Sequence, residues 1–298
     1  MSSAPRLDRI VLGHNSFFGV NHLSRQHGAD REAMFEDTKN IVRMMETAAA
    51  ADVTAMMMST HPRASAVANV VRGSHELRDR WSFYPLLPYI TKYVKQANEK
   101  GMVNIVLDQL KQAGWTQALG ILARGGLGAL TKDYRHILAT MIGLELAPFE
   151  GLRLHTVFLH DVLTDLALAL DIPEVLELHA TEIQKRFGAR PGYATKNLPL
   201  LVERFASYGF ATPLVLVQIN KIGFGMNPSR EACERALTTP GLEVMAMGTL
   251  ASGYLKPKEA YEYIFARPAV QSVVVGVSTP SHAAETFAAV REAASALR

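Results

Sequence analysis

The sequence predicts an α/β fold, a (β/α)8 barrel. Eight short apolar segments rich in β-branched residues are spread along its 298 residues, and a helical pattern follows each of them. Parallel strands need crossover helices and, when buried on both sides, read as continuous apolar runs. The length agrees, because one such barrel typically takes about 250 residues or more. We therefore expect residues 1–298 to form a single barrel domain.

The expected strands follow one another in chain order. They are residues 9–13, 53–59, 81–87, 154–159, 192–196, 214–219, 242–247 and 270–276. A helix is expected over residues 30–51, and the last helix is predicted from the segment PSHAAETF, which carries proline and serine at its start. Residues 99–151 are too long for one crossover helix and include a GGLG bend, so we expect an inserted helical segment there.

The composition excludes several classes of protein. With 48% hydrophobic and 20% charged residues, the chain can bury a sizeable core and is not disordered. Its 31 basic and 28 acidic residues form no long basic block, so neither nucleic acid nor an anionic membrane is an expected partner. The single cysteine, Cys233, excludes an internal disulfide. Without a secretory h-region or a bilayer-spanning apolar run, the expectation is a cytoplasmic protein that binds a small polar molecule, in an oligomeric state left open.

Four candidate catalytic residues follow expected strands directly. In barrels of this class the active site lies at the carboxyl ends of the strands, where the sequence has His14, His61 and His160, with Asp161 beside the last. Histidine suits acid–base chemistry because its unperturbed pKa is about 6.5. Each residue also has a structural interpretation: His160 as a buried structural histidine, Asp161 as a helix cap, His61 as a solvated loop residue and His14 as part of a turn.

Five further polar residues are candidates for substrate binding, because amides and phenols suit an oxygen-rich molecule. They are Asn15, Tyr84, Tyr89, Gln218 and Asn220. Alternation along the sixth strand puts Gln218 and Asn220 on one face and Lys221 on the other. A lysine on a barrel strand can form a Schiff base, but we interpret Lys221 and Lys196 as solvated surface residues.

Common catalytic motifs are absent from the sequence. There is no GxxxxGK[ST], no GxGxxG after a strand, no HExxH and no GxSxG. Carboxylates are scarce after the expected strands, which argues against a two-carboxylate glycosidase and a magnesium cage. A divalent metal held by histidines stays possible, since imidazole suits zinc or iron.

Several segments resemble the aldo-keto reductase superfamily. The opening IVLGHNSFFGVN is similar to that family's first strand, and LEVMAMGTLASGYL and VQSVVVGVSTPSHAAETFAA resemble its seventh and eighth strands with the loops that follow. TVFLHD and VQIN resemble its fourth and sixth strands. The resemblance implies a barrel that binds a nicotinamide cofactor, with His160 as the catalytic histidine and Gln218 against the nicotinamide.

The sequence departs from this family at three of four catalytic positions. Ser59 or Met58 stands where the aspartate is expected, Ala64 replaces the tyrosine, and the third strand carries no lysine. The loop VSTPSH also lacks the lysine and arginine that would hold a 2′-phosphate. Because of these losses we do not expect NADPH to bind, and no cofactor is predicted.

The leading hypothesis is therefore an enzyme with nicotinamide-independent acid–base chemistry, a lyase, isomerase or hydrolase, in which His160 is the principal acid or base. One alternative is a divergent NAD(P)-dependent oxidoreductase in which Tyr84 or Tyr89 replaces the lost proton donor. A second alternative is a non-catalytic binding protein that keeps only the barrel.

Overall fold

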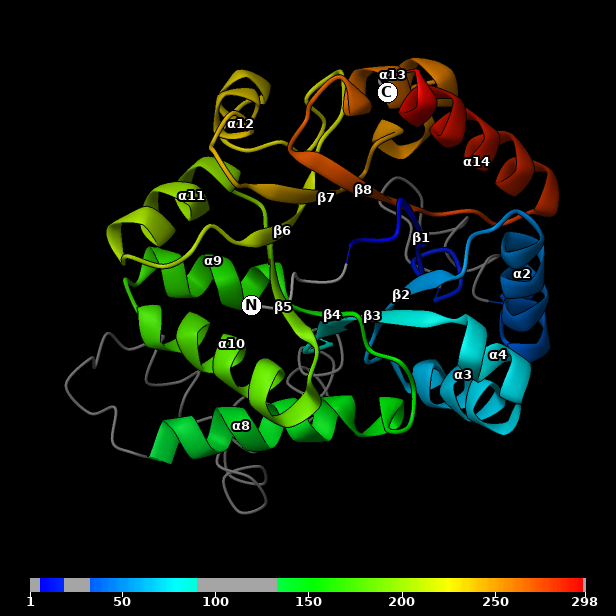
Figure 1. Cartoon of the computed structure of the whole chain (residues 1–298), viewed down its shortest axis with the longest axis horizontal. Coiled ribbons are helices and arrows are strands. Elements are labelled where there is room, and N and C mark those ends of the chain that lie inside the picture. Colours follow the sequence, from blue (N-terminus) through cyan, green and yellow to red (C-terminus); the bar gives the residue numbers. More distant parts are fainter. Residues whose placement is uncertain (1–5, 19–32, 90–132, 297–298) are drawn as a thin grey trace.

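Eight parallel strands close into a barrel in chain order, as Figure 1 shows. The structure is a computed structural model that describes residues 6–18, 33–89 and 133–296. The strands are β1 (Ile10–Leu12), β2 (Ala55–Ser59), β3 (Ser82–Leu87), β4 (Thr156–Leu159), β5 (Arg190–Thr195), β6 (Leu214–Gln218), β7 (Glu243–Met247) and β8 (Val270–Val275). The predicted (β/α)8 barrel is confirmed, and each expected strand is present with boundaries that differ by at most two residues.

Helices surround the barrel on its outside (Figure 1). They are α2 (Thr38–Ala50), α3 (Pro62–Gly73), α4 (His75–Arg80), α8 (Asp133–Leu146), η2 (Ala147–Phe149), α9 (Asp161–Ala169), α10 (Pro173–Phe187), α11 (Leu198–Ser207), α12 (Arg230–Ala236), η3 (Ala251–Gly253), α13 (Pro257–Phe265) and α14 (Pro280–Ser295). The helix α2 begins later than the sequence pattern suggests, because the Asp37 side chain caps it by accepting a hydrogen bond from the Lys39 amide. Of the expected insertion 99–151, residues 99–132 lie outside the described residues; the described remainder is largely α8 and η2.

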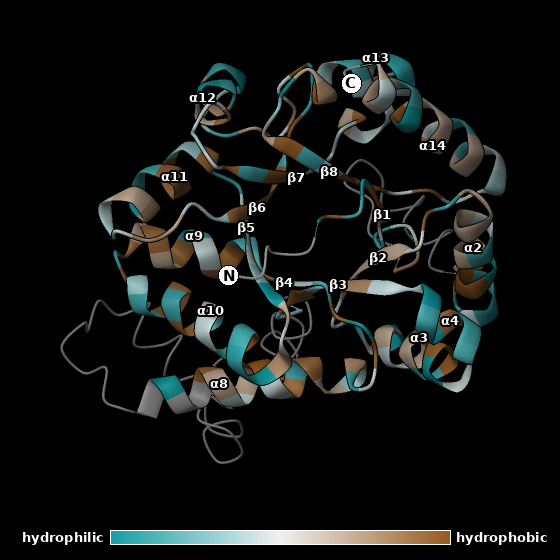
Figure 2. Cartoon of the chain, in the orientation of Figure 1, coloured by the Kyte–Doolittle hydropathy of each residue, from teal (hydrophilic) through white to brown (hydrophobic). Residues whose placement is uncertain are grey.

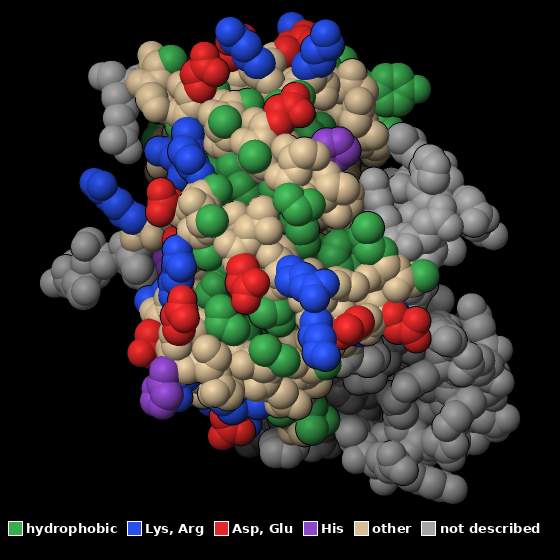
Figure 3. All heavy atoms as spheres, turned by 90° about the vertical axis from the view of Figure 1, so that its right-hand side faces the viewer, with side chains coloured by type: hydrophobic (Ala, Val, Ile, Leu, Met, Phe, Trp, Pro, Cys, Tyr) green, Lys and Arg blue, Asp and Glu red, His purple; other side chains and the backbone are tan. Residues whose placement is uncertain are grey.

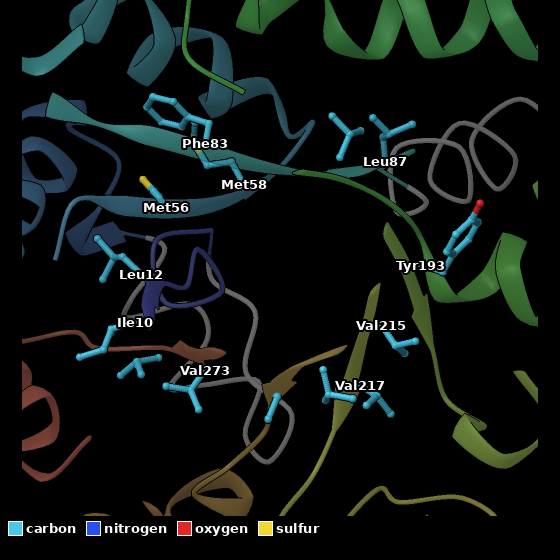
Figure 4. Close-up of a cluster of buried hydrophobic side chains, with 14 of the residues drawn as sticks. Ile10, Leu12, Met56, Met58, Phe83, Leu87, Tyr193, Val215, Val217 and Val273 are labelled. Atoms are coloured by element: carbon cyan, nitrogen blue, oxygen red, sulfur yellow. The ribbon is translucent and has the colours of Figure 1, made fainter. Parts of the chain in front are cut away.

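Alternation along the strands divides the core into two layers. Outward side chains such as Leu12, Phe83 and Val217 pack beneath the helices (Figure 4), and apolar residues run along the strands and the helix sides that face them (Figure 2). The inward layer is Val11, Ala55, Met57, Tyr84, Phe158, Ala194, Leu214, Leu216 and Met245. Since side chains alternate, the next inward positions at the carboxyl end are Ser59, His160, Lys196, Gln218 and Met247. These positions, together with the residues that directly follow the strands, form the mouth of the barrel.

Tyr84 lies at the opposite end of the barrel from the mouth. Its hydroxyl donates to Asp8 Oδ2 at 2.6 Å, and Asp8 precedes β1. Its ring stacks on His155, which precedes β4, with centroids 4.8 Å apart. Burial, together with the Asp8 carboxylate, raises the pKa of the Tyr84 phenol and keeps it protonated. Tyr84 thus belongs to the amino-terminal layer of the barrel interior, because it is an inward side chain in the first half of β3. Its expected role in substrate binding or proton donation stays a prediction, and these contacts do not support it.

The outer surface mixes charges of both signs. On the face seen in Figure 3, acidic and basic side chains are interspersed, in agreement with the balanced composition. Within the described ranges, none of the helices has the length and apolarity needed to cross a membrane.

Candidate functional site

Three histidines meet at the carboxyl end of the barrel. His14 follows β1, His61 follows β2 and His160 follows β4, and parallel strands bring these ends to one side. The pKa of His14 is lowered to about 4, chiefly by burial, and the charges of His61 and His160 act in the same direction. The His14 Nδ1 lies 3.1 Å from the Met57 carbonyl oxygen. We conclude that His14 is a neutral, fixed part of the mouth.

His160, Asp161 and Lys196 form an ion cluster at this mouth. The His160 Nδ1 is 2.5 Å from Asp161 Oδ1, and the Lys196 Nζ is 3.4 Å from Asp161 Oδ2. Burial of Asp161 would raise its pKa, but the hydrogen bond and charge of His160, followed by the charge of Lys196, outweigh burial and lower the pKa to about 2. Asp161 is therefore ionised at any ordinary pH and holds two basic groups together.

The hydrogen bonds at the start of α9 indicate which imidazole nitrogen is available. Both His160 Nδ1 (3.3 Å) and Asp161 Oδ1 (3.1 Å) can accept from the Val162 amide. The short contact between His160 and Asp161 favours a proton on Nδ1, because two lone pairs would repel each other at that distance. Asp161 then satisfies the Val162 amide, and the His160 Nε2 is left to exchange a proton. The cap and the acid–base interpretation of Asp161 are thus compatible.

The sequence did not predict that Lys196 lies at the mouth. The preceding residue, Thr195, faces outward, because its Oγ1 bonds to Asp165 Oδ1 of α9 at 2.5 Å. Alternation then turns Lys196 toward the mouth, where it pairs with Asp161 although its side chain is 47% exposed. The segment GYATK has too little contrast between polar and apolar residues to show which of its side chains face the barrel interior. Lys221, by comparison, pairs with Glu259 at 2.6 Å among exposed side chains, as expected for a surface lysine.

The two amides of the sixth strand have different environments. Gln218 packs against Gly225 and Gly248, which have φ of +67° and +62°, and a Cβ on Gly225 would lie only 1.8 Å from Gln218 Oε1. The amide of Asn220 is fully buried; it accepts from the Phe224 amide at 2.8 Å and donates to the Phe224 carbonyl at 2.8 Å and the Gly248 carbonyl at 3.3 Å. Asn220 therefore holds the loop after β6, while Gln218 is the amide positioned at the mouth.

Four rings form a continuous aromatic row beside the cluster: His14, Phe18, His61 and Tyr89. The centroids of His14 and Phe18 are 5.2 Å apart, His61 stacks on Phe18 at 4.4 Å, and Tyr89 meets His61 edge to face at 5.0 Å. His61 also caps α3, since its Nδ1 accepts from the Arg63 amide at 3.1 Å. The row gives the β1–β3 side of the mouth a rigid aromatic wall.

Two smaller polar groups, Asn15 and Ser59, also lie at the mouth. Asn15 is exposed in the turn after β1, so its amide is open to solvent. The Ser59 hydroxyl at the end of β2 is buried, and it has no hydrogen-bond partner within the described part of the chain. Nor do the described residues contain a group of three or more His, Cys, Asp or Glu side chains suited to a metal ion. The possible histidine-ligated metal therefore gains no support from them.

Comparison with solved structures identifies the fold. A protein from Pseudomonas aeruginosa assigned as an aldo-keto reductase is 15% identical, with 96% of this chain and 91% of that chain covered and a TM-score of 0.62. An aldo-keto reductase from a Medee basin deep-sea metagenome library is 9% identical, with 98% and 93% covered and a TM-score of 0.55. The holo form of an aldo-keto reductase from Bacillus halodurans is 10% identical, with 97% and 91% covered and a TM-score of 0.55. Neither protein-family models nor curated proteins give a match to the sequence.

The chain thus has the barrel of the aldo-keto reductases, and the resemblance seen in its sequence is confirmed at the level of the fold. The leading expectation of a nicotinamide-independent lyase, isomerase or hydrolase is wrong, because the structures that share this barrel along nearly its whole length are reductases. The expectation of no cofactor is wrong for the same reason, since one of these reductases was solved in a holo form. Both expectations rested on the absence of the aspartate, tyrosine and lysine from the positions where the family resemblance places them.

Proposed function

We propose that this protein is a divergent NAD(P)H-dependent oxidoreductase that reduces the carbonyl group of a small polar molecule to an alcohol. The observation that carries the proposal is the cluster of His160, Asp161 and Lys196 at the mouth of a barrel shared with aldo-keto reductases. It supplies a proton donor and a positive charge, the two functions that the missing tyrosine and lysine would have supplied.

The residues at the mouth suit a nicotinamide cofactor. The amide of Gln218, which packs against Gly225 and Gly248, can pair with a carboxamide, and the buried Ser59 hydroxyl has no hydrogen-bond partner among the described residues. After β7, Ala251 and Ser252 have φ of +46° and +60°, a strained backbone of the kind that accumulates at ligand sites. A bound nicotinamide would supply the hydride that the carbonyl carbon accepts.

His160 is the residue that we assign as proton donor. Its Nε2–H would protonate the carbonyl oxygen as negative charge develops there, while Asp161 holds Nδ1–H and stabilises the imidazolium. Lys196 adds a positive charge near that oxygen, which lowers the energy of the charged transition state. Tyr89 lies on the aromatic row beside the cluster and is the alternative donor. Both donors give the same products, an alcohol and the oxidised nicotinamide.

The experiment is a turnover assay with NADH and NADPH against a panel of polar aldehydes and ketones, followed by the loss of reduced-nicotinamide absorbance. We expect turnover with at least one combination of nicotinamide and carbonyl compound. The matched variants His160→Asn and Tyr89→Phe should then identify the proton donor. A loss of rate in His160→Asn alone supports the assignment, and a loss in Tyr89→Phe alone assigns the proton to Tyr89. Absence of turnover with every pair would reject an oxidoreductase function.

A further inference from the structure

A buried carboxylate outside the ion cluster reaches the loops at the mouth. Glu145 lies in the last turn of α8 and is 4% exposed. Its Oε2 accepts hydrogen bonds from the Tyr89 amide at 3.1 Å and from the Thr60 hydroxyl. The Tyr89 amide also lies 3.1 Å from the Thr60 Oγ1. One carboxylate oxygen thus ties together the segments that follow β2 and β3.

These two segments carry half of the aromatic row. Thr60 directly precedes His61, and Tyr89 contributes the neighbouring ring, 5.0 Å from His61. The same end of β3 contacts the ion cluster, because the Leu87 carbonyl accepts from the His160 amide at 2.8 Å. The position of the aromatic wall relative to His160 therefore depends on the carboxylate of Glu145.

The location of this carboxylate is unfavourable for the stability of the helix itself. A negative charge near a helix carboxyl end opposes the helix dipole, and a buried carboxylate loses its hydration. What the buried side chain gains are the hydrogen bonds from the Tyr89 amide and the Thr60 hydroxyl. Such an arrangement favours precise geometry at the two loops over the stability of α8.

We propose that Glu145 is a positioning residue for substrate, which fixes His61 and Tyr89 at the distance from His160 that the carbonyl compound requires. The proposal rests on the proposed function, because it assigns the aromatic row to the substrate side of that site. Loss of the carboxylate should weaken substrate binding and leave nicotinamide binding largely unchanged. A purely structural role would instead lower the amount of folded enzyme without changing either KM.

The first test compares Glu145→Ala and Glu145→Gln with Glu150→Gln, an exposed glutamate just after η2 whose backbone carbonyl, not its side chain, binds Arg72. We expect Glu145→Ala to raise the KM for the carbonyl substrate about tenfold, with less than about a twofold change for the nicotinamide. Glu145→Gln should restore most of the loss, and Glu150→Gln should match the native enzyme. Equal changes in both KM values, or none, would overturn the proposal.

A double variant tests whether the effect passes through the aromatic row. In the Tyr89→Ala background, Glu145→Ala should raise KM by a smaller factor than it does in the native enzyme, because one of the two rings that it positions is gone. Fully additive increases would show that Glu145 does not act through the Tyr89 ring and would overturn its positioning of that ring.

A measurement that does not depend on enzyme activity can test the positioning role of Glu145 separately from the proposed function. The His61 ring resonances report its stacking on Phe18 and Tyr89, and they are assigned by their loss in His61→Gln. They should shift in folded Glu145→Ala and stay in place in Glu150→Gln. If the native enzyme shows no turnover but these resonances shift, the proposed function fails while the positioning of the ring stands. Unchanged His61 resonances in folded Glu145→Ala would refute the positioning.

Discussion

The imidazole Nδ1 of His160 lies 2.5 Å from the carboxylate Oδ1 of Asp161, its neighbour in sequence. The pair sits where β4 ends and α9 begins, so one short segment both caps a helix and orients an acid–base group. Lys196 reaches the other carboxylate oxygen from the end of β5. Substitutions in this cluster can distinguish a role in chemistry from a role in holding the fold.

Replacing His160 by asparagine separates its two roles. Asparagine is a good N-cap, and Asp161 continues to accept from the Val162 amide, so α9 should stay capped. We expect turnover to fall about 10²–10⁴-fold, the usual loss for a general acid or base, with a melting temperature close to native. Steady-state rates and thermal melts on one preparation check this. Normal turnover with a lowered melting temperature would make His160 a structural residue.

Replacing Lys196 by methionine should raise the pKa of Asp161. The positive charge of Lys196 helps to lower this pKa to about 2, so the variant should show a higher value in carbon NMR of the carboxyl group. Lys221→Met is the matched control, since the two lysines are 47% and 48% exposed and each pairs with a carboxylate. We expect kcat/KM to fall about tenfold in Lys196→Met only. Equal effects of the two substitutions would remove Lys196 from the site.

Acid should destabilise the protein through its buried histidines. The pKa values of His14 and His179 are lowered from 6.5 to about 4, chiefly by burial. Between these values the unfolded chain binds more protons than the native one, so stability decreases as the pH falls from 6.5 to 4. A shift of this size corresponds to roughly 3 kcal/mol for each group at 1.36 kcal/mol per pKa unit. The ionised Asp161 adds a further loss only below its ordinary pKa of 3.8, as the pH falls toward about 2.

Urea unfolding measured at several pH values checks this dependence. His179→Gln should flatten the decrease between pH 6.5 and 4, whereas His75→Gln, at an exposed position on α4, should leave it unchanged. A stability that does not change over this interval would show that the buried imidazoles bind protons as readily as those of the unfolded chain.

Tyr84→Phe should affect stability and leave catalysis alone. The substitution removes a hydrogen bond to the Asp8 carboxylate at the amino-terminal end of the barrel. A hydrogen bond to a charged group contributes about 1.5–3 kcal/mol, so the free energy of unfolding should fall by that order. The KM and kcat values should equal those of the native enzyme. A changed KM would return Tyr84 to the substrate site.

The strands were predictable because their chemistry is local. Runs such as VFL in β4 and LVLV in β6 alternate with helical patterns, and this periodicity is sufficient to predict a barrel. The same logic placed His14, His61 and His160 after strand ends, where the structure has them. Parallel strands carry all such residues to one side, so sequence position alone predicts their common end.

The remaining features depend on contacts between residues that lie far apart in the sequence, and these contacts cannot be predicted from local patterns. The Tyr84 hydroxyl donates to Asp8, which lies 76 residues away in the chain. Glu145 reaches Thr60 across 85 residues. Lys196 could be placed only once Thr195 was seen to face Asp165. An absent family motif is therefore weak grounds for excluding a function, because equivalent groups can come from other strands.

The most direct test of the account is a fluorescence titration of the protein with NADH and with NADPH, which needs no knowledge of the substrate. We expect saturable binding of at least one of them, with a Kd in the micromolar range typical of enzyme ligands. Gln218→Leu should weaken it about tenfold, because a positioned amide would be lost. If neither nucleotide binds even at millimolar concentration, this barrel does not use a nicotinamide cofactor, and the proposed reduction is contradicted.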